Sequence, residues 1–180
     1  MIELATLIIP CKDDHQELQS LLLKIITWKA VPQEIIIVDS SLSKIQLSLE
    51  FEAFAKKNSL SINIIFKKDL FPGHARNLGI NVASHSTLAF LDSRTIPEEN
   101  WLQDGLKLIR DSKAEGVWGS TIYNAKYFQA KIIRASTYGV NPLQTLPGSI
   151  LKKNIFNKCG LFLENIRAGE DSDWINRAKL

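Results

Sequence analysis

Four short apolar runs, separated by segments with helical spacing, restrict the folds open to this chain more than any other feature. The runs occupy residues 4–9, 35–38, 62–66 and 88–91. Each is too short for an independent helix, and none alternates with polar residues, which is typical of strands that are buried on both faces. We therefore predict four strands in the interior of a sheet.

The segments between these runs have the apolar spacing of helices that cover a sheet. A capping box of Asp14 and Glu17 predicts the start of the first helix, and Pro97 with Glu98 and Glu99 predicts the start of the fourth. The apolar positions are Leu18, Leu21, Leu22 and Ile25 in the first helix, Ile45, Leu49 and Ala53 in the second, Ala75, Leu78, Gly79 and Val82 in the third, and Leu102, Gly105, Leu106 and Ile109 in the fourth. Alternation of strand and helix implies right-handed crossovers. The expected fold is α/β and Rossmann-like, with a mainly parallel sheet and helices on both faces.

The pattern loosens after Gly116. Residues 117–119 predict a further strand, 125–135 a helix, and 141–148 a proline-containing loop. A last helix is expected from about Gly169 to Leu180. Because no C-cap follows it, we expect one domain over residues 1–180 that is cut short at its C-terminal end.

Composition restricts the ligand and the compartment. The 22 basic and 19 acidic residues give a net charge of +3 without a long run of one sign, which suits a small anionic ligand and does not indicate nucleic acid. Cys11 and Cys159 form no metal-binding pattern, and the N-terminus has no secretory signal. We expect a cytoplasmic protein, with membrane association at the inner face only through sequence outside these residues, because no apolar run approaches the roughly 20 residues of a membrane span.

Two aspartates stand where α/β sheets bind ligands. Asp39 ends the run 35–38, and Asp92 ends the run 88–91. Since ligands bind beyond the carboxyl ends of parallel strands, both carboxylates are predicted to face one crevice. The alternative for each is that it only caps the next helix.

Other common sites are absent from the sequence. It contains neither GxGxxG after the first run nor GxxxxGK followed by Ser or Thr, which disfavours dinucleotide dehydrogenases and P-loop enzymes. His15, His74 and His85 have no metal-ligand spacing, and we assign them no role.

Five segments, in the same order, resemble the family 2 glycosyltransferases, which have the GT-A fold. Residues 7–13 resemble the family's opening strand and turn, and residues 34–43 its second strand and turn. Residues 71–80 carry the Ala-Arg-Asn sequence, residues 90–94 stand at the Asp-x-Asp motif, and residues 169–177 resemble the Glu-Asp block. The resemblance covers nearly the whole chain and implies the nucleotide-diphospho-sugar transferase fold.

The resemblance also implies a binding site for a nucleotide-diphospho-sugar donor. The residues that it places there are Pro10, Cys11, Asp13, Asp39, Ser40, Arg76, Asp92, Ser93 and Arg94. The first turn and Asp39 are expected to hold the base and the ribose, and Ser40 replaces a second acid of many members, which leaves the base open. Arg76 is expected to approach the diphosphate or the motif acids as a forked, permanently charged donor.

In the family, the Asp-x-Asp motif helps to orient Mg²⁺ or Mn²⁺ on the diphosphate, and Asp92 is its first acid here. Arg94 replaces the last acid, and an arginine cannot ligate a cation. Three alternatives stay open: Arg94 itself supplies positive charge to the leaving diphosphate, other groups hold the metal, or the protein no longer catalyses. We favour the first.

The Glu-Asp block implies the catalytic residues. Asp171 is the expected base, which deprotonates the acceptor hydroxyl in an inverting transfer, and Glu170 is expected to orient the acceptor or the loop. The alternative is that both acids only favour the start of a helix. Gly148 and Ser149 are expected to line the donor sugar site through backbone groups.

The function implied is an inverting glycosyltransferase, bacterial in type, that acts on a polysaccharide, a glycolipid or a similar carbohydrate or lipid-linked acceptor. Residues 1–115 are expected to form the nucleotide-binding half and residues 116–180 the acceptor-side half. Arg94 motivates the alternative of a catalytically inactive nucleotide-sugar-binding module. A sugar-nucleotide pyrophosphorylase is disfavoured, because residues 10–14 contain no glycine.

Overall fold

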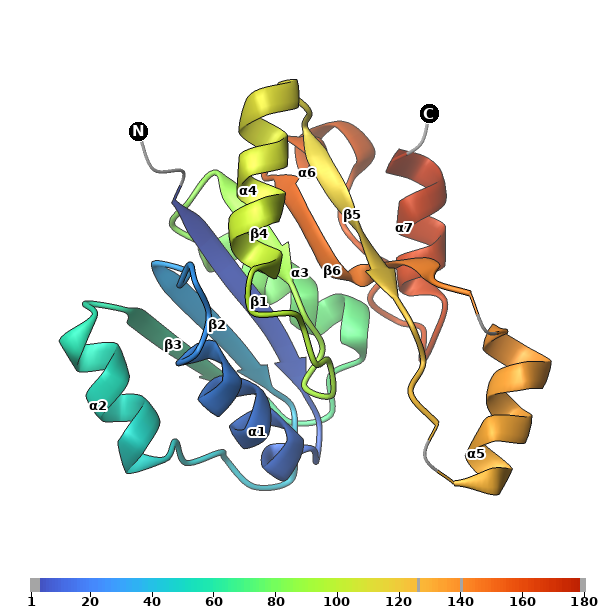
Figure 1. Cartoon of the computed structure of the whole chain (residues 1–180), viewed down its shortest axis with the longest axis horizontal. Coiled ribbons are helices and arrows are strands. Elements are labelled where there is room, and N and C mark those ends of the chain that lie inside the picture. Colours follow the sequence, from blue (N-terminus) through green and yellow to red (C-terminus); the bar gives the residue numbers. More distant parts are fainter. Residues whose placement is uncertain (1–3, 126, 140, 179–180) are drawn as a thin grey trace.

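A six-stranded sheet forms the centre of the protein (Figure 1). The structure, a computed structural model, describes residues 4–125, 127–139 and 141–178. The strands are β1 (Ala5–Cys11), β2 (Glu34–Asp39), β3 (Ser61–Phe66), β4 (Thr87–Phe90), β5 (Gly116–Thr121) and β6 (Leu143–Lys152). They lie in the order β3-β2-β1-β4-β6-β5. The first four in this order are parallel, and β6 runs antiparallel to both β4 and β5. The predicted mainly parallel sheet is confirmed.

Helices cover both faces of the sheet. They are α1 (His15–Ile25), α2 (Leu49–Lys57), α3 (Pro72–Val82), α4 (Trp101–Ser112), α5 (Phe128–Ile133), which continues into a π-helical turn η1 (Arg134–Tyr138), α6 (Asn154–Cys159) and α7 (Glu170–Ala178). Buried side chains of α1, α2 and α4 pack on one face, and those of α3, α6 and α7 pack on the other. Figure 1 looks onto α1, α2 and α4, with α3 behind the sheet.

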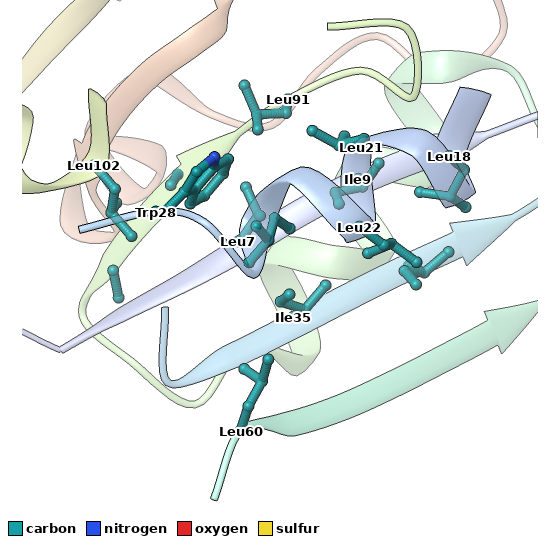
Figure 2. Close-up of a cluster of buried hydrophobic side chains, with 14 of the residues drawn as sticks. Leu7, Ile9, Leu18, Leu21, Leu22, Trp28, Ile35, Leu60, Leu91 and Leu102 are labelled. Atoms are coloured by element: carbon teal, nitrogen blue, oxygen red, sulfur yellow. The ribbon is translucent and has the colours of Figure 1, made fainter. Parts of the chain in front are cut away.

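Successive strand residues feed the two cores alternately, because neighbouring side chains on a strand point to opposite faces. Leu7 and Ile9 of β1 pack on the α1 side, as Figure 2 shows, whereas Ile8 packs on the α3 side. All three are fully buried. A strand that is buried on both faces has few polar positions, which explains the apolar runs of β1, β2 and β4. The prediction of an interior strand is wrong for residues 62–66, because β3 lies at the sheet edge and none of its residues is fully buried.

Three helices differ in detail from their predictions. In α3 the predicted inward position Val82 is exposed, at the last turn of the helix. Helix α2 buries Phe51 and Ala55, whereas the predicted positions Leu49 and Ala53 are exposed, and Ile45 is buried in the loop before the helix. The N-cap of α2 is Ser48, whose side chain accepts a hydrogen bond from the Phe51 N–H. Phe51 and Ala55 are four positions apart and therefore face the core together. Helix α4 begins only at Trp101, so the predicted first turn at residues 97–99 lies before it.

The predicted capping box of α1 is not formed. Asp14 is the N-cap residue, but its side chain makes no capping hydrogen bond. Its carboxylate instead accepts from Ser93 and Arg94, which lie beyond β4. A charged donor across the sheet edge thus takes the place of the helix N–H groups.

The predicted loop at residues 141–148 is wrong, because most of it belongs to β6. Pro147 and Gly148 lie within this strand, opposite an irregularity in the pairing between Val117 and Gly119. Proline is tolerated in a sheet at such irregularities. Gly119 is required there, since a Cβ would lie 2.1 Å from the Pro147 oxygen.

The other late elements agree with their predictions. Residues 117–119 lie in β5, and α5 with η1 overlaps the helix predicted at 125–135, whose residue 126 lies outside the described residues. Helix α7 is the predicted last helix, and positions 179–180 of that prediction lie outside the described residues. Among the described helices, none has the length and apolar character needed to cross a bilayer.

Candidate functional site

The loops that follow β1, β2 and β4 meet at the carboxyl edge of the sheet and are joined by hydrogen bonds. The Asp13 N–H donates to Ser41 Oγ over 2.7 Å, and Asp13 Oδ1 accepts from the Leu42 N–H over 3.2 Å. Ser93 Oγ donates to Asp14 Oδ2 over 3.1 Å. The three loops therefore form one continuous rim at the place where parallel sheets bind ligands.

The end of β1 and the turn that follows it contain the predicted residues Pro10, Cys11 and Asp13. The Cys11 carbonyl accepts from the N–H and the hydroxyl of Ser40, at 2.8 and 3.1 Å, which fixes the ends of β1 and β2 against each other. Burial raises the pKa of the Cys11 thiol to about 11, with a further contribution from the Asp39 charge, so the thiol is neutral at pH 7. Asp13 has a left-handed backbone with φ of 57°, which aspartate tolerates better than most residues.

Asp39 is fully buried and holds the loop after β2. Its Oδ2 accepts from the Ile45 N–H over 2.7 Å, and its Oδ1 accepts from the Ser41 N–H over 3.1 Å. Burial by itself raises the pKa of this carboxyl, but hydrogen bonds from Ser41 and Ile45 outweigh it and lower the pKa. The structure thus gives Asp39 a loop-holding position, and its direct contact with a nucleotide stays a prediction.

Arg76 joins two distant acids at the centre of this edge. Its Nη2 donates to Asp92 Oδ1 over 2.8 Å, and its Nη1 donates to Glu170 Oε1 over 2.5 Å. The guanidinium carbon also lies 5.8 Å from the centre of the Phe162 ring, within cation–π range. Burial alone lowers the pKa of Arg76, but the charges of Asp92 and Glu170 outweigh it and raise the pKa above its ordinary value. The structure therefore brings three of the predicted residues into one ion-pair cluster.

The remainder of the Ala-Arg-Asn segment fixes α3 against the chain that leads into α7. Asn77 Nδ2 donates to the Phe162 carbonyl and to Glu164 Oε1, both over 2.9 Å, and Asn77 Oδ1 accepts from the Phe162 N–H over 3.0 Å. At Gly73, a Cβ would lie 2.0 Å from the Leu163 oxygen. These close approaches hold Arg76 in position to reach Glu170.

Arg94 lies in the loop after β4 and binds Asp14, which follows β1, so it belongs to the rim and not to the Arg76 cluster. Its Nε donates to Asp14 Oδ1 over 3.0 Å, its Nη2 contacts the same oxygen, and its side chain is 70% exposed. Asp14 is the main cause that raises the pKa of Arg94. Asp14 thus holds both Ser93 and Arg94, and it leaves the arginine accessible to a ligand.

Asp171 and Glu170 begin α7 but differ in their surroundings. Glu170 is buried and bound to Arg76, whereas Asp171 is half-buried, and its Oδ1 accepts only from the neighbouring Ser172 N–H, over 2.8 Å, among the contacts of the described residues. The more accessible acid is therefore the one that the sequence predicts as the base.

This arrangement can be compared with known proteins. The sequence profile of Glycosyl transferase family 2 matches residues 6–162, a range that contains the rim, Arg76 and Asp92. This chain belongs to glycosyltransferase family 2.

A curated relative agrees with this assignment, and several solved structures share the fold. The family 2 chain is 32% identical, over 147 residues, to an uncharacterized glycosyltransferase of Rickettsia bellii (strain RML369-C), and the match covers 76% of the chain and 20% of that relative. S. aureus TarS 1–349 has a TM-score of 0.68 and 18% identity, with 97% of this chain and 55% of that one covered. The same fragment has also been solved with UDP-GlcNAc.

A second structural neighbour is the mannosyltransferase PcManGT from Pyrobaculum calidifontis, in complex with GDP-Man and Mn²⁺. Its TM-score is 0.61 and its identity 14%, over 94% of this chain and 49% of that one. These likenesses confirm the predicted GT-A fold. The family 2 chain spans one fifth of its curated relative and about half of these neighbours.

The motif residues of this family 2 chain do not form a divalent cation site of their own. Asp92 offers one carboxylate oxygen beside the one bound to Arg76, and the position of the second acid carries Arg94. The one cluster of three candidate ligands found in the described parts of the chain is Cys11, His15 and Asp39, on the rim. Mg²⁺ and Mn²⁺ prefer oxygen ligands, and the Asp39 oxygens already accept backbone N–H groups, so this cluster does not fit either ion.

Sequence reasoning missed two residues of the family 2 site. Asp14 was expected only to cap α1, and His15 was given no role, although its Nε2 lies 3.4 Å from Asp39 Oδ1. An acid directly after the first strand was the available signal for Asp14, because that position lies on the ligand edge. No spacing in the sequence indicates the contact of His15.

Proposed function

We propose that this glycosyltransferase moves a sugar from a nucleotide-diphospho-sugar, bound at the rim, to an acceptor hydroxyl with inversion at the anomeric carbon. The observation that carries the proposal is the Arg76 bridge between Asp92 and Glu170. It fixes the start of α7, where Asp171 stands, against the strand end that carries the donor motif. A base and a donor site held by one rigid connection suit a reaction that requires in-line geometry.

A nucleotide-sugar donor is supported by the chemistry of the rim and by the neighbours. TarS was solved with UDP-GlcNAc and PcManGT with GDP-Man. Backbone groups of the turn after β1 and the exposed Asp13 side chain can bind a base or ribose hydroxyls. The two neighbours bind different bases and different sugars, so the proposal names neither for this chain. Binding measurements with individual nucleotides identify the base.

Positive charge for the leaving diphosphate is assigned to Arg94. Its exposed guanidinium needs only to exchange Asp14 for a phosphate oxygen, a bond type for which arginine is well suited. Arg76 is already engaged by two acids and buried, so it positions those acids. In this proposal the transfer proceeds without Mg²⁺ or Mn²⁺ held by the protein.

Asp171 is assigned as the base and Glu170 as its positioning residue. As the acceptor oxygen bonds to the anomeric carbon, Asp171 takes the hydroxyl proton. The bond from that carbon to the diphosphate oxygen breaks on the opposite face, and its electron pair leaves with the nucleoside diphosphate. Glu170 is unsuited to this step because Arg76 already occupies its buried carboxylate.

In the same proposal, the two halves of the chain bind different substrates. Residues 1–115 supply the rim, Arg76 and Asp92, and residues 116–180 supply Glu170 and Asp171 on the acceptor side. The acceptor class proposed is a carbohydrate or a lipid-linked carbohydrate. A second candidate, an inactive nucleotide-sugar-binding module, is favoured by a single observation, the replacement of the second motif acid by Arg94.

One experiment separates these candidates. Nucleoside diphosphates are first screened by calorimetry, with and without Mn²⁺, to identify the base. Labelled sugar donors with that base are then followed for transfer or for hydrolysis of the sugar. Product formation supports the transferase, whereas tight donor binding without any turnover assigns the chain to the inactive module.

A further inference from the structure

The connection between β5 and β6 exposes an unusual number of large apolar side chains. We call residues 122–143 the arm. Its exposed apolar residues are Ile122, Tyr123, Tyr127, Phe128, Ile132, Ile133 and Leu143. Tyr127 and Phe128 are 75% and 76% exposed, and α5 buries none of its residues. Figure 1 shows α5 apart from the two helical layers, at the end of the extended chain that leaves β5.

Single exposed apolar residues are ordinary, but a cluster of this kind marks an interaction surface. Within α5, Phe128 and Ile132 are four positions apart and therefore share one face. Lys131 is three positions from Phe128 and therefore lies at the border of this face. Phe128 and Ile132 therefore form an exposed apolar face on α5 with a basic residue at its border.

The arm has a positive charge, which favours a negatively charged partner. Between Glu115 and Glu164 the sequence contains no acidic residue, and the arm itself contains Lys126, Lys131 and Arg134. The chain as a whole is nearly balanced, with 22 basic and 19 acidic residues. A second copy related by two-fold symmetry would bring these like charges together, which opposes self-association through the arm.

The complementary partner has an anionic surface over an apolar interior, as in a bilayer with acidic phospholipids. Amphipathic helices with basic residues on one face and aromatic or aliphatic residues on the other lie in the interface of such membranes. We propose that the arm binds an anionic bilayer surface, with Phe128 and Ile132 inserted at the headgroup boundary and Lys131 beside lipid phosphates. This site lies within the chain, whereas the sequence had placed membrane association only outside it. The proposal is independent of sugar transfer.

The test is flotation of the purified protein with vesicles of phosphatidylcholine alone and of phosphatidylcholine with phosphatidylglycerol. Binding is expected only to the anionic vesicles, and it should weaken as salt rises. The double variant Phe128→Ser with Ile132→Ser is expected to lose binding by about tenfold or more, because two large apolar groups no longer leave water. Lys131→Glu is expected to lose at least about fivefold, since each basic residue near such a surface contributes a factor of this size.

Matched controls change the same residue types on other helices. Leu49→Ser with Leu108→Ser removes exposed apolar groups from α2 and α4, and Lys107→Glu reverses a charge on α4. These controls are expected to float like the wild type. Equal binding to both vesicle types, unchanged binding of the arm variants, or an absence of binding with arm-dependent dimerisation would each overturn the proposal, and the last result would assign the arm to a second copy of the chain.

Discussion

Arg76 and Glu170 form a buried ion pair, with 2.5 Å between Nη1 and Oε1, although 94 positions separate them in the chain. The side chains are only 4% and 6% exposed. Because the same guanidinium also binds Asp92, the pair connects the donor motif to the first turn of α7. The motif residues of three segments therefore depend on one another both for position and for charge compensation.

Removal of Arg76 should destabilise the protein strongly. Arg76→Ala leaves a buried carboxylate without its partner, which typically costs about 3–5 kcal/mol. The free energy of unfolding in urea at pH 7 measures this loss. Arg110→Ala is the control. Arg110 pairs with Asp111, both side chains are exposed, and such a pair should contribute no more than about 1 kcal/mol to the free energy of unfolding. Similar losses in the two variants would contradict a special role of the bridge.

The two acids at the start of α7 should separate into a base and a positioning residue. Asp171→Asn is expected to lower the transfer rate by about 10²–10⁴-fold, the usual contribution of a general base, and to leave donor binding nearly unchanged. Glu170→Gln, by contrast, should lower the free energy of unfolding, because Arg76 loses a charged partner. Transfer kinetics, donor calorimetry and urea unfolding are compared for both variants. Wild-type rates in Asp171→Asn would remove this residue from the mechanism.

Arg94 should determine the metal requirement. Transfer by the wild type is expected to persist in excess EDTA, whereas Arg94→Ala should lose activity with little change in the free energy of unfolding, since the side chain is largely exposed. Arg94→Asp restores the second motif acid, and its activity should rise when Mn²⁺ is added. Strict metal dependence of the wild type would overturn the assignment of positive charge to Arg94.

Asp39 should link loop stability to pH and to nucleotide binding. Its pKa is lower in the folded protein than the ordinary value of 3.8. Its stabilisation is therefore complete well above pH 4 and declines as pH falls through that value towards the folded pKa. Asp39→Asn should reduce the difference in unfolding free energy between pH 7 and pH 3, and it should weaken nucleotide binding.

An exposed acid provides the comparison for Asp39. Asp111→Asn on α4 should leave both the pH dependence and nucleotide binding unchanged, because its pair with Arg110 is exposed. Unaltered pH dependence in Asp39→Asn would show that the loop hydrogen bonds tolerate the loss of charge.

The sequence predicted the sheet well, because burial on both faces leaves a simple signal. The run 35–38 has no polar residue, and β2 is buried along its whole length. The inward face of α2 was predicted wrongly, since Leu49 and Phe51 are both apolar and spacing alone does not select between them. The strand character of 143–148 was hidden by Pro147 and Gly148, whose placement depends on an irregular pairing with β5.

The site was predictable where a residue ends a strand and unpredictable where partners come from distant segments. Asp92 could be placed at the carboxyl edge from its position after an apolar run. The choice of Glu170 as the partner of Arg76 depends on how α3 and α7 pack together on one face of the sheet, and the choice of Asp14 as the partner of Arg94 depends on how the loops after β1 and β4 meet. Local patterns in the sequence contain no information about those distances.

The position of β6 between β4 and β5 also determines the order in which the sheet can be completed. Strand β5 is at the sheet edge, and its one sheet neighbour is β6, which ends at Lys152. On the ribosome, strands β1 to β4 can pair with one another as soon as residues 5–90 have been synthesised. Strand β5 can enter the sheet only after β6 has been synthesised. The donor edge is therefore expected to form early, and α7 delivers Asp171 to it only after the last strand has entered the sheet.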